Sequence, residues 1–156
     1  MDMLIVDSRE KPKAIKMILS QFEAEGVPYM VSKLPIGDYM DFHRPGLIVD
    51  RKQNIAEIAK NVTTDRARFV RELERAKSVG SKLVILVEQN RFKERDKWVH
   101  VEDISDLMLW SSPHTKIRGE KVFRVLSELI YKYDISVEFC DKRSTGKRIL
   151  EIIYNG

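Results

Sequence analysis

The sequence predicts an α/β fold in which a mixed central β-sheet is flanked by helices. Short runs rich in Val, Ile and Leu alternate along the chain with segments whose apolar residues recur at helical spacing. The run 82–89 is apolar almost throughout, as in a strand at the centre of a sheet that is covered on both faces. The 156 residues contain no internal repeat and no linker, so residues 1–156 are expected to form one domain.

The first half of the chain supplies most of the expected strands. Residues 3–8 form a short run of β-branched and aliphatic residues, which predicts a buried strand. Pro12 and Gly26 suit the beginning and the end of the helix that follows. An Arg-Pro-Gly turn signal at 44–46 then separates two strands. The further strands of this half are expected at 27–35, 36–42 and 46–52.

In the second half, helical patterns alternate with apolar runs. Asn54, three residues before Glu57, predicts the cap of a helix over 54–62, and another helical pattern continues to Gly80. A charged connector follows the central apolar run. The remaining elements are expected to be helices over 101–111 and 117–133, a strand at 135–140 and a C-terminal helix that begins at Ser144 or Thr145.

The composition narrows the classes of function. Lys and Arg number 28 against 24 Asp and Glu, and the resulting net charge of +4 is compatible with a polyanionic partner such as nucleic acid. The single cysteine, Cys140, excludes an internal disulfide and any cysteine-based zinc site. No stretch approaches the roughly 18–20 apolar residues of a membrane span, and the first residues do not resemble a signal peptide. A cytoplasmic protein without a membrane partner is therefore expected.

An acidic set that ends in a lysine is the most informative feature of the chain. Asp7 lies at the end of the first expected strand and Glu10 just after it, and Asp38 lies in a Gly-Asp-Tyr triplet. Asp50 precedes Lys52 by two residues in a strand, so both side chains point to the same face. Carboxylates can hold a hard cation while a lysine positions the attacking water, which is the equipment of a Mg²⁺-dependent phosphodiester hydrolase.

Three short motifs occur in an order and spacing that resemble a known family. They are Val-Asp-Ser-Arg-Glu at 6–10, Gly-Asp-Tyr at 37–39 and Asp-Arg-Lys at 50–52. The chain resembles the nuclease domain of the XPF/Mus/Hef group (ERCC4-like) of structure-specific nucleases, within the PD-(D/E)XK superfamily. The likeness covers about 4–90, and more loosely the helical part at about 100–156. It implies a restriction-endonuclease-like fold.

The resemblance also implies an activity and its requirements. Members cleave branched or flap DNA with Mg²⁺ or Mn²⁺ in repair and recombination, often as dimers that carry a second, helix-hairpin-helix domain. The present sequence leaves no room for that domain and looks like the compact stand-alone forms of bacteriophages. Two positions depart from the family pattern. Asp50 replaces the usual glutamate, and Ala56, followed by Glu57, stands where the family tends to place an aspartate.

The resemblance and the motifs assign roles to individual residues. Asp38 and Asp50 are expected to bind the metal ion, helped by Glu10 or Asp7 directly or through water, while Lys52 orients the attacking water. Arg51 supports catalysis by pairing with a carboxylate or with phosphate. The candidate DNA-binding residues are Arg9, Arg68, Arg71, Arg75, Lys116, Arg118 and Lys121.

Simpler interpretations stay open beside these roles. The arginines at 66–75 are nearly as typical of an ordinary charged helix face, and Trp98 and Trp110 suit either base stacking or core packing. For the chain as a whole, a catalytically inactive DNA-binding scaffold or partner subunit is one alternative. A metal-dependent enzyme for a small phosphorylated substrate is another, although the chain has no Gly-rich phosphate loop.

Overall fold

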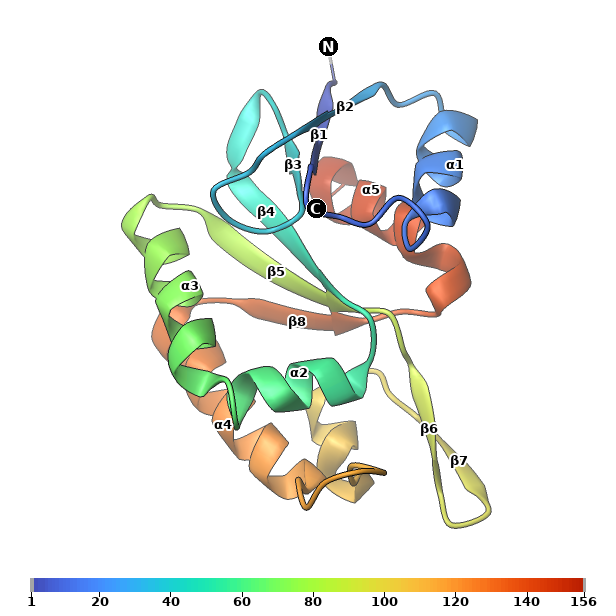
Figure 1. Cartoon of the computed structure of the whole chain (residues 1–156), viewed down its shortest axis with the longest axis vertical. Helices are drawn as coiled ribbons and strands as arrows, with labels where there is room; N and C mark the ends of the chain where they lie inside the picture. Colours follow the sequence, from blue (N-terminus) through green and yellow to red (C-terminus); the bar gives the residue numbers. More distant parts are fainter. Residues whose placement is uncertain (1, 156) are drawn as a thin grey trace.

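The computed structural model describes residues 2–155 and confirms the mixed α/β fold (Figure 1). Its central sheet has six strands in the order β2-β1-β3-β4-β5-β8. These strands are β1 (Leu4–Asp7), β2 (Tyr29–Ser32), β3 (Tyr39–Asp41), β4 (Arg44–Lys52), β5 (Lys82–Val87) and β8 (Ser136–Phe139). Within residues 2–155, no helix is long and apolar enough to cross a membrane.

The direction of the strands brings several of their ends to one edge of the sheet. β1 is parallel to β2, and β4, β5 and β8 are parallel to one another. β3 is antiparallel to both of its neighbours, β1 and β4, so β1 and β4 run the same way. The carboxyl ends of β1, β4 and β5 therefore meet the beginning of β3 at one edge, which is where open α/β sheets carry their sites.

Helices cover both faces of the sheet, and the alternation of side chains along β5 explains why. Val84 and Leu86 pack with one cluster of buried apolar residues, whereas Leu83, Ile85 and Val87 pack with the other. The first cluster is covered by α1 (Lys16–Ala24) and α5 (Thr145–Asn155) (Figure 1). The second is covered by α2 (Ile55–Val62), α3 (Arg66–Ser78) and α4 (Gly119–Tyr133).

Three segments differ from the prediction. Residues 44–46, expected as a turn, are the first residues of β4, and the turn lies before them at residues 42–43. The charged connector is a β-hairpin of β6 (Arg91–Glu94) and β7 (Lys97–His100), because Phe92 is buried against the core beneath one of its faces. The expected helix over 101–111 is a 3₁₀ segment, η1 (Ile104–Leu109), that ends where Trp110 becomes extended. A second short 3₁₀ segment, η2 (Lys142–Ser144), precedes α5.

Candidate active site

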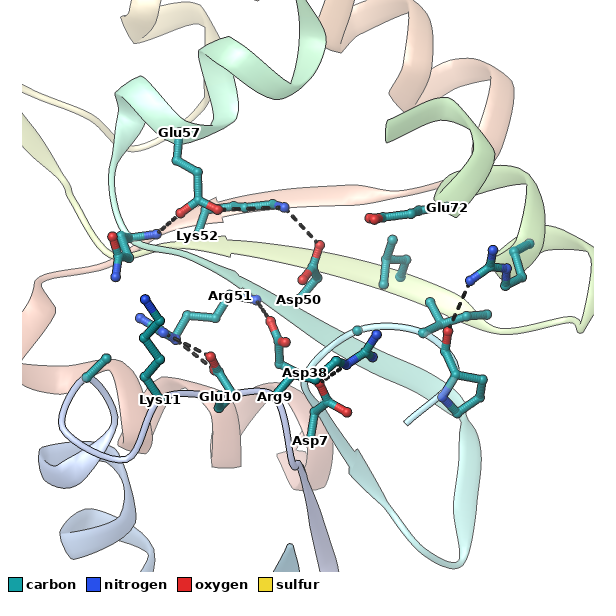
Figure 2. A pocket seen from close by; sticks show the side chains of 17 residues that line it. Asp7, Arg9, Glu10, Lys11, Asp38, Asp50, Arg51, Lys52, Glu57 and Glu72 are labelled. Atoms are coloured by element: carbon teal, nitrogen blue, oxygen red, sulfur yellow. Dashed lines mark hydrogen bonds and ion pairs between the residues drawn. The ribbon is translucent and has the colours of Figure 1, made fainter. Parts of the chain in front are cut away.

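The sheet edge where these strand ends meet borders a cleft with a volume of about 480 Å³ (Figure 2). Most of the side chains that line it are charged. Those with a charge are Asp7, Arg9, Glu10, Lys11, Asp38, Asp50, Arg51, Lys52, Glu57, Glu72 and Arg75. Side chains that lie far apart in the sequence, from β1, β4 and α3, thus share one concave surface.

The turn before β3 presents Asp38 to the cleft. The backbone N–H of Asp38 donates to the carbonyl of Val49 at 2.9 Å, and the N–H of Asp7 donates to the carbonyl of Asp38 at 2.8 Å. Asp38 is therefore fixed between β1 and β4. Gly37 before it has a φ of +68°, and a Cβ atom there would lie 2.3 Å from Cγ2 of Ile48. Both the backbone conformation and the space at this turn require glycine.

Asp38, which is half-buried, and Asp50, which is buried, form a pair of neighbouring acids. Burial and the neighbouring Asp50 carboxylate raise the pKa of Asp38 to about 9. The backbone N–H of Arg51 donates to Oδ2 of Asp38 at 2.7 Å, which favours the ionised form but does not outweigh the first two effects. Without a cation beside it, the carboxyl group of Asp38 therefore keeps its proton near neutral pH.

Lys52 provides the ammonium group beside this pair. Its Nζ lies 3.3 Å from Oδ2 of Asp50 and 4.0 Å from Oε2 of Glu57. Burial disfavours the charged form of Lys52, but Asp50, Glu57 and Glu72 outweigh burial and raise the pKa of the amine. Lys52 is therefore a hydrogen-bond donor with a full positive charge, and it is unsuited to accept a proton.

Arg51 points to the other side of the strand end and binds two carboxylates. Its Nε and Nη2 donate to the two oxygens of Glu10 at 2.8 and 3.0 Å, and its Nη1 donates to Glu88 (Figure 2 shows the pair with Glu10). The hydroxyl of Tyr39 also donates to Glu10, at 2.9 Å. Glu88 in turn accepts a hydrogen bond of 2.6 Å from Thr145, the first residue of α5. This buried network joins β1, β3, β4, β5 and α5.

Asp7 is also committed to structural partners. Its Oδ1 accepts the backbone N–H of Leu34 at 2.8 Å, and its Oδ2 accepts Nε of Arg9 at 2.8 Å. The same arginine donates to the carbonyl of Leu34 at 2.7 Å. Asp7 is only 2% exposed, so its two oxygens fasten the segment after β2 to the end of β1.

The structure separates the predicted site residues into groups. Asp7, Glu10, Asp38, Asp50, Arg51 and Lys52 all line the cleft, and so do Arg9 and Arg75 of the predicted DNA-binding set. Arg68 lines an adjoining hollow of about 270 Å³ that Lys52 and Glu72 share. Arg71 is exposed on the same helix. The basic residues Lys116, Arg118 and Lys121, at the start of α4, line neither hollow.

Some residues that belong to the site carried little signal in the sequence. Glu88 was recognisable as a charged residue at the end of an apolar run, like Asp7 and Asp50. Tyr39 and Thr145 become partners of the buried carboxylates only through the tertiary fold. Glu72 reaches from α3 towards Asp50, and a charged helix face gave no reason to single it out (Figure 2).

The donor set fits a small divalent cation. Within residues 2–155, no group of three or more His, Cys, Asp and Glu side chains is arranged as a ready-made metal cage. Mg²⁺ commonly uses one or two carboxylates and completes its shell with water and substrate phosphate. Asp38 and Asp50 supply two carboxylates, and the raised pKa of Asp38 indicates a place where a positive charge relieves the repulsion between them.

The strand order and the acidic cleft at the strand ends identify the class of fold. It is a restriction-endonuclease-like nuclease fold. The ERCC4 domain family matches residues 6–153, and the chain belongs to that family. No curated protein matches the sequence.

Two solved structures with this fold are similar over nearly the whole chain. XPF from Aeropyrum pernix has a TM-score of 0.67 and 21% identity, covering 96% of this chain and 62% of that one. XPF from Aeropyrum pernix in complex with DNA also has a TM-score of 0.67, with 20% identity, 97% of this chain and 63% of that one. The chain thus spans about three fifths of the length of these structures. At such identity the likeness concerns the fold.

Proposed function

We propose that the protein is an endonuclease that uses Mg²⁺ or Mn²⁺ to hydrolyse phosphodiester bonds in branched or flap DNA. The observation that carries this proposal is the pair of Asp38 and Asp50 with the ammonium of Lys52 3.3 Å from Asp50, all lining one cleft. Membership of the ERCC4 domain family supports the substrate class.

In this proposal Asp38 and Asp50 hold the cation. When bound there, the cation would withdraw electron density from the scissile phosphate and increase the acidity of the attacking water. Lys52 donates a hydrogen bond that orients this water and offsets negative charge as it develops, because its amine stays charged. Arg9 and Arg75 line the same cleft, and in this proposal they contact phosphates of the DNA near the cut.

Three further residues of the cleft do not contact the cation directly in this proposal and act through the groups that they hold: Glu10, Asp7 and Arg51. Both oxygens of Glu10 are held by Arg51, and both oxygens of Asp7 are held by Arg9 and the N–H of Leu34. Any help they give to the cation passes through water. Arg51 is a positioning residue, because its backbone N–H holds Asp38 while its side chain fixes the strand end against Glu10.

The setting of the activity is part of the same proposal. The resemblance to compact phage-like forms favours a stand-alone nuclease domain in the cytoplasm that takes part in repair, recombination or phage DNA processing, alone or as a homodimer. The similar fold of XPF from Aeropyrum pernix, solved in complex with DNA, supports a DNA partner. The arginines of α3 that face the two hollows are the proposed contacts to the duplex, and the basic start of α4 is a further candidate.

A DNA-binding scaffold without nuclease activity is the second candidate. Asp50 in place of the family's glutamate shortens one ligand by a methylene group, and the firm pairing of Glu10 and Asp7 leaves two of the four expected carboxylate ligands for a cation. This candidate keeps the cleft and its arginines for phosphate contact. It predicts binding of branched DNA with no cleavage in any metal.

A panel of labelled duplex, flap, fork and four-way junction DNAs, with Mg²⁺, Mn²⁺ or EDTA, separates the two candidates. We expect cleavage of at least one branched DNA in Mg²⁺ or Mn²⁺ and none in EDTA. Asp38→Ala and Lys52→Ala should each lower the rate to below about a hundredth, the loss typical for removal of one preorganised charged group. The exposed controls Asp2→Asn and Lys13→Ala should cut normally. Full activity of either cleft variant would refute the assignment.

A further inference from the structure

The β6–β7 hairpin has two faces of different character. Paired residues of an antiparallel ladder point to the same side, and successive residues alternate. Phe92 pairs with Val99, and both pack against the core that α2, α3 and α4 cover. Lys93 pairs with Trp98 on the opposite side. The hairpin is thus anchored by one face and offers the other to solvent.

Two cationic side chains lie over the ring of Trp98 on the solvent face of the hairpin. Trp98 is 57% exposed, whereas Trp110, the other tryptophan, is 6% exposed. The guanidinium carbon of Arg91 lies 4.6 Å from the centre of the Trp98 ring, and Nζ of Lys93 lies 5.2 Å from it. Neither cation has an ion-pair partner within residues 2–155. Core packing does not require this indole, because Phe92 and Val99 already anchor the hairpin.

The hairpin begins at the same sheet edge as the acidic cleft. Lys52 pairs with Val87 at the end of β5, and the N–H of Glu88 donates to the carbonyl of Lys52 at 2.8 Å. Gln89 accepts the N–H of Ile55 at 2.9 Å and donates to the carbonyl of Arg91 at 2.9 Å. The base of the hairpin is therefore tied to the first turn of α2, and Figure 1 shows the hairpin projecting from the body beyond the end of β5.

We propose that Arg91, Lys93 and Trp98 form a binding site for an unpaired strand of the DNA substrate, outside the cleavage site. The indole offers a surface on which one base stacks, and the two cations contact the phosphates beside it. Bases inside a duplex are stacked on each other and cannot reach the ring, so the site selects single-stranded DNA. The choice of DNA as the ligand rests on the proposed function.

Binding to a single-stranded oligothymidylate of about 20 nucleotides in EDTA tests the site without any cleavage. Titration should quench the emission of the exposed Trp98, and Trp98→Phe should remove that quenching while it keeps most of the affinity. Trp98→Ala should weaken binding about 5- to 150-fold, the loss of one base–aromatic stack. Arg91→Gln combined with Lys93→Gln should reduce the slope of log affinity against log salt by about 1.4.

Two controls make the result specific to the hairpin. Lys13→Gln, exposed and outside the cleft, should bind as the wild type does, and thermal unfolding of each hairpin variant should stay close to the wild type because the anchoring face is unchanged. Affinity of Trp98→Ala equal to wild type would overturn the proposal. If the hairpin surface binds a protein partner instead of DNA, Trp98→Ala will likewise bind the oligothymidylate as the wild type does. Quenching that persists in Trp98→Phe would overturn it as well.

Cleavage assays distinguish failure of the site from failure of the proposed function. If the protein is no nuclease, wild type and variants alike leave every DNA uncut in Mg²⁺, yet the oligothymidylate titration still reports the site. If the hairpin site is wrong, the wild type cuts branched DNA and Trp98→Ala binds and cuts equally well. If both hold, Trp98→Ala should lose activity on a DNA with a single-stranded flap and keep it on a four-way junction without one.

Discussion

Two pairs of carboxylates lie at the same sheet edge and differ in the partners that surround them. Glu10 and Asp7 each have both oxygens paired with a donor, chiefly Arg51 and Arg9. Asp38 and Asp50 face each other, and burial with mutual repulsion raises the pKa of Asp38 to about 9. The carboxylates of one half of the cleft thus stabilise the fold through their arginine partners. In the other half Lys52 pairs with Asp50, and the raised pKa of Asp38 shows that a further positive charge, such as a cation, would be favourable there.

The carboxylates that are paired with arginine should contribute mainly to the stability of the fold. Arg51→Met leaves Glu10 and Glu88 buried without their main partner, and removal of one member of a buried ion pair costs about 3–5 kcal/mol. We therefore expect the largest loss of unfolding free energy for this variant, measured by urea denaturation. Arg71→Met, on the exposed face of α3, serves as the control and should change the free energy by less than about 0.5 kcal/mol. Equal effects of the two substitutions would show that the buried network contributes nothing.

The turn that presents Asp38 should be the next most sensitive position. Gly37→Ala places a Cβ atom on a residue with a φ of +68° and 2.3 Å from Ile48, so the turn must shift. We expect a loss of about 1–3 kcal/mol together with a fall in cleavage rate, because Asp38 moves with its turn. Gly46→Ala provides a matched control, since nothing lies within 4 Å of an added Cβ there. A variant at position 37 that is as stable and active as the one at 46 would contradict this reading.

Substitution of Asp38 should have a smaller effect on stability than the two changes above, and it should stabilise the metal-free protein. Between about pH 4 and 9, folded Asp38 keeps a proton that the unfolded chain has released, so metal-free stability falls as pH rises through this window. Asp38→Asn removes this contribution and keeps an acceptor for the N–H of Arg51. We expect its Tm to exceed that of the wild type by an amount that grows from pH 4 to 9, at roughly 2–4 °C for each kcal/mol. Calorimetric scans in EDTA measure it, and a Tm difference independent of pH would contradict the raised pKa of Asp38.

The sequence predicted the sheet better than it predicted the hairpin. Apolar runs such as 82–89 have strand character whatever surrounds them, and β5 is buried on both faces as expected. The β6–β7 hairpin has a single apolar pair, Phe92 and Val99, among charged residues, so its alternation was too weak to separate from a connector. Its strand character becomes evident only when the core beneath it is in place.

The candidate site could be predicted as a set of residues and not as a network. Asp38, Asp50 and Lys52 converge as their spacing and strand positions indicated. The partners that immobilise the other carboxylates come from distant positions, such as Thr145 for Glu88 and the N–H of Leu34 for Asp7. Spacing along a chain carries no information about these contacts, so the division between supporting and reactive carboxylates required the structure.

The most direct test of this division is calorimetric titration of Mn²⁺ at pH 8 in two buffers that differ in ionisation enthalpy. We predict that the wild type binds Mn²⁺ and releases close to one proton per ion, because the proton held by Asp38 must leave. Asp38→Asn should bind much more weakly and release none, while Asp2→Asn should match the wild type. Absence of Mn²⁺ binding by the wild type, or equal binding by Asp38→Asn, would contradict the assignment of this pair as the metal site.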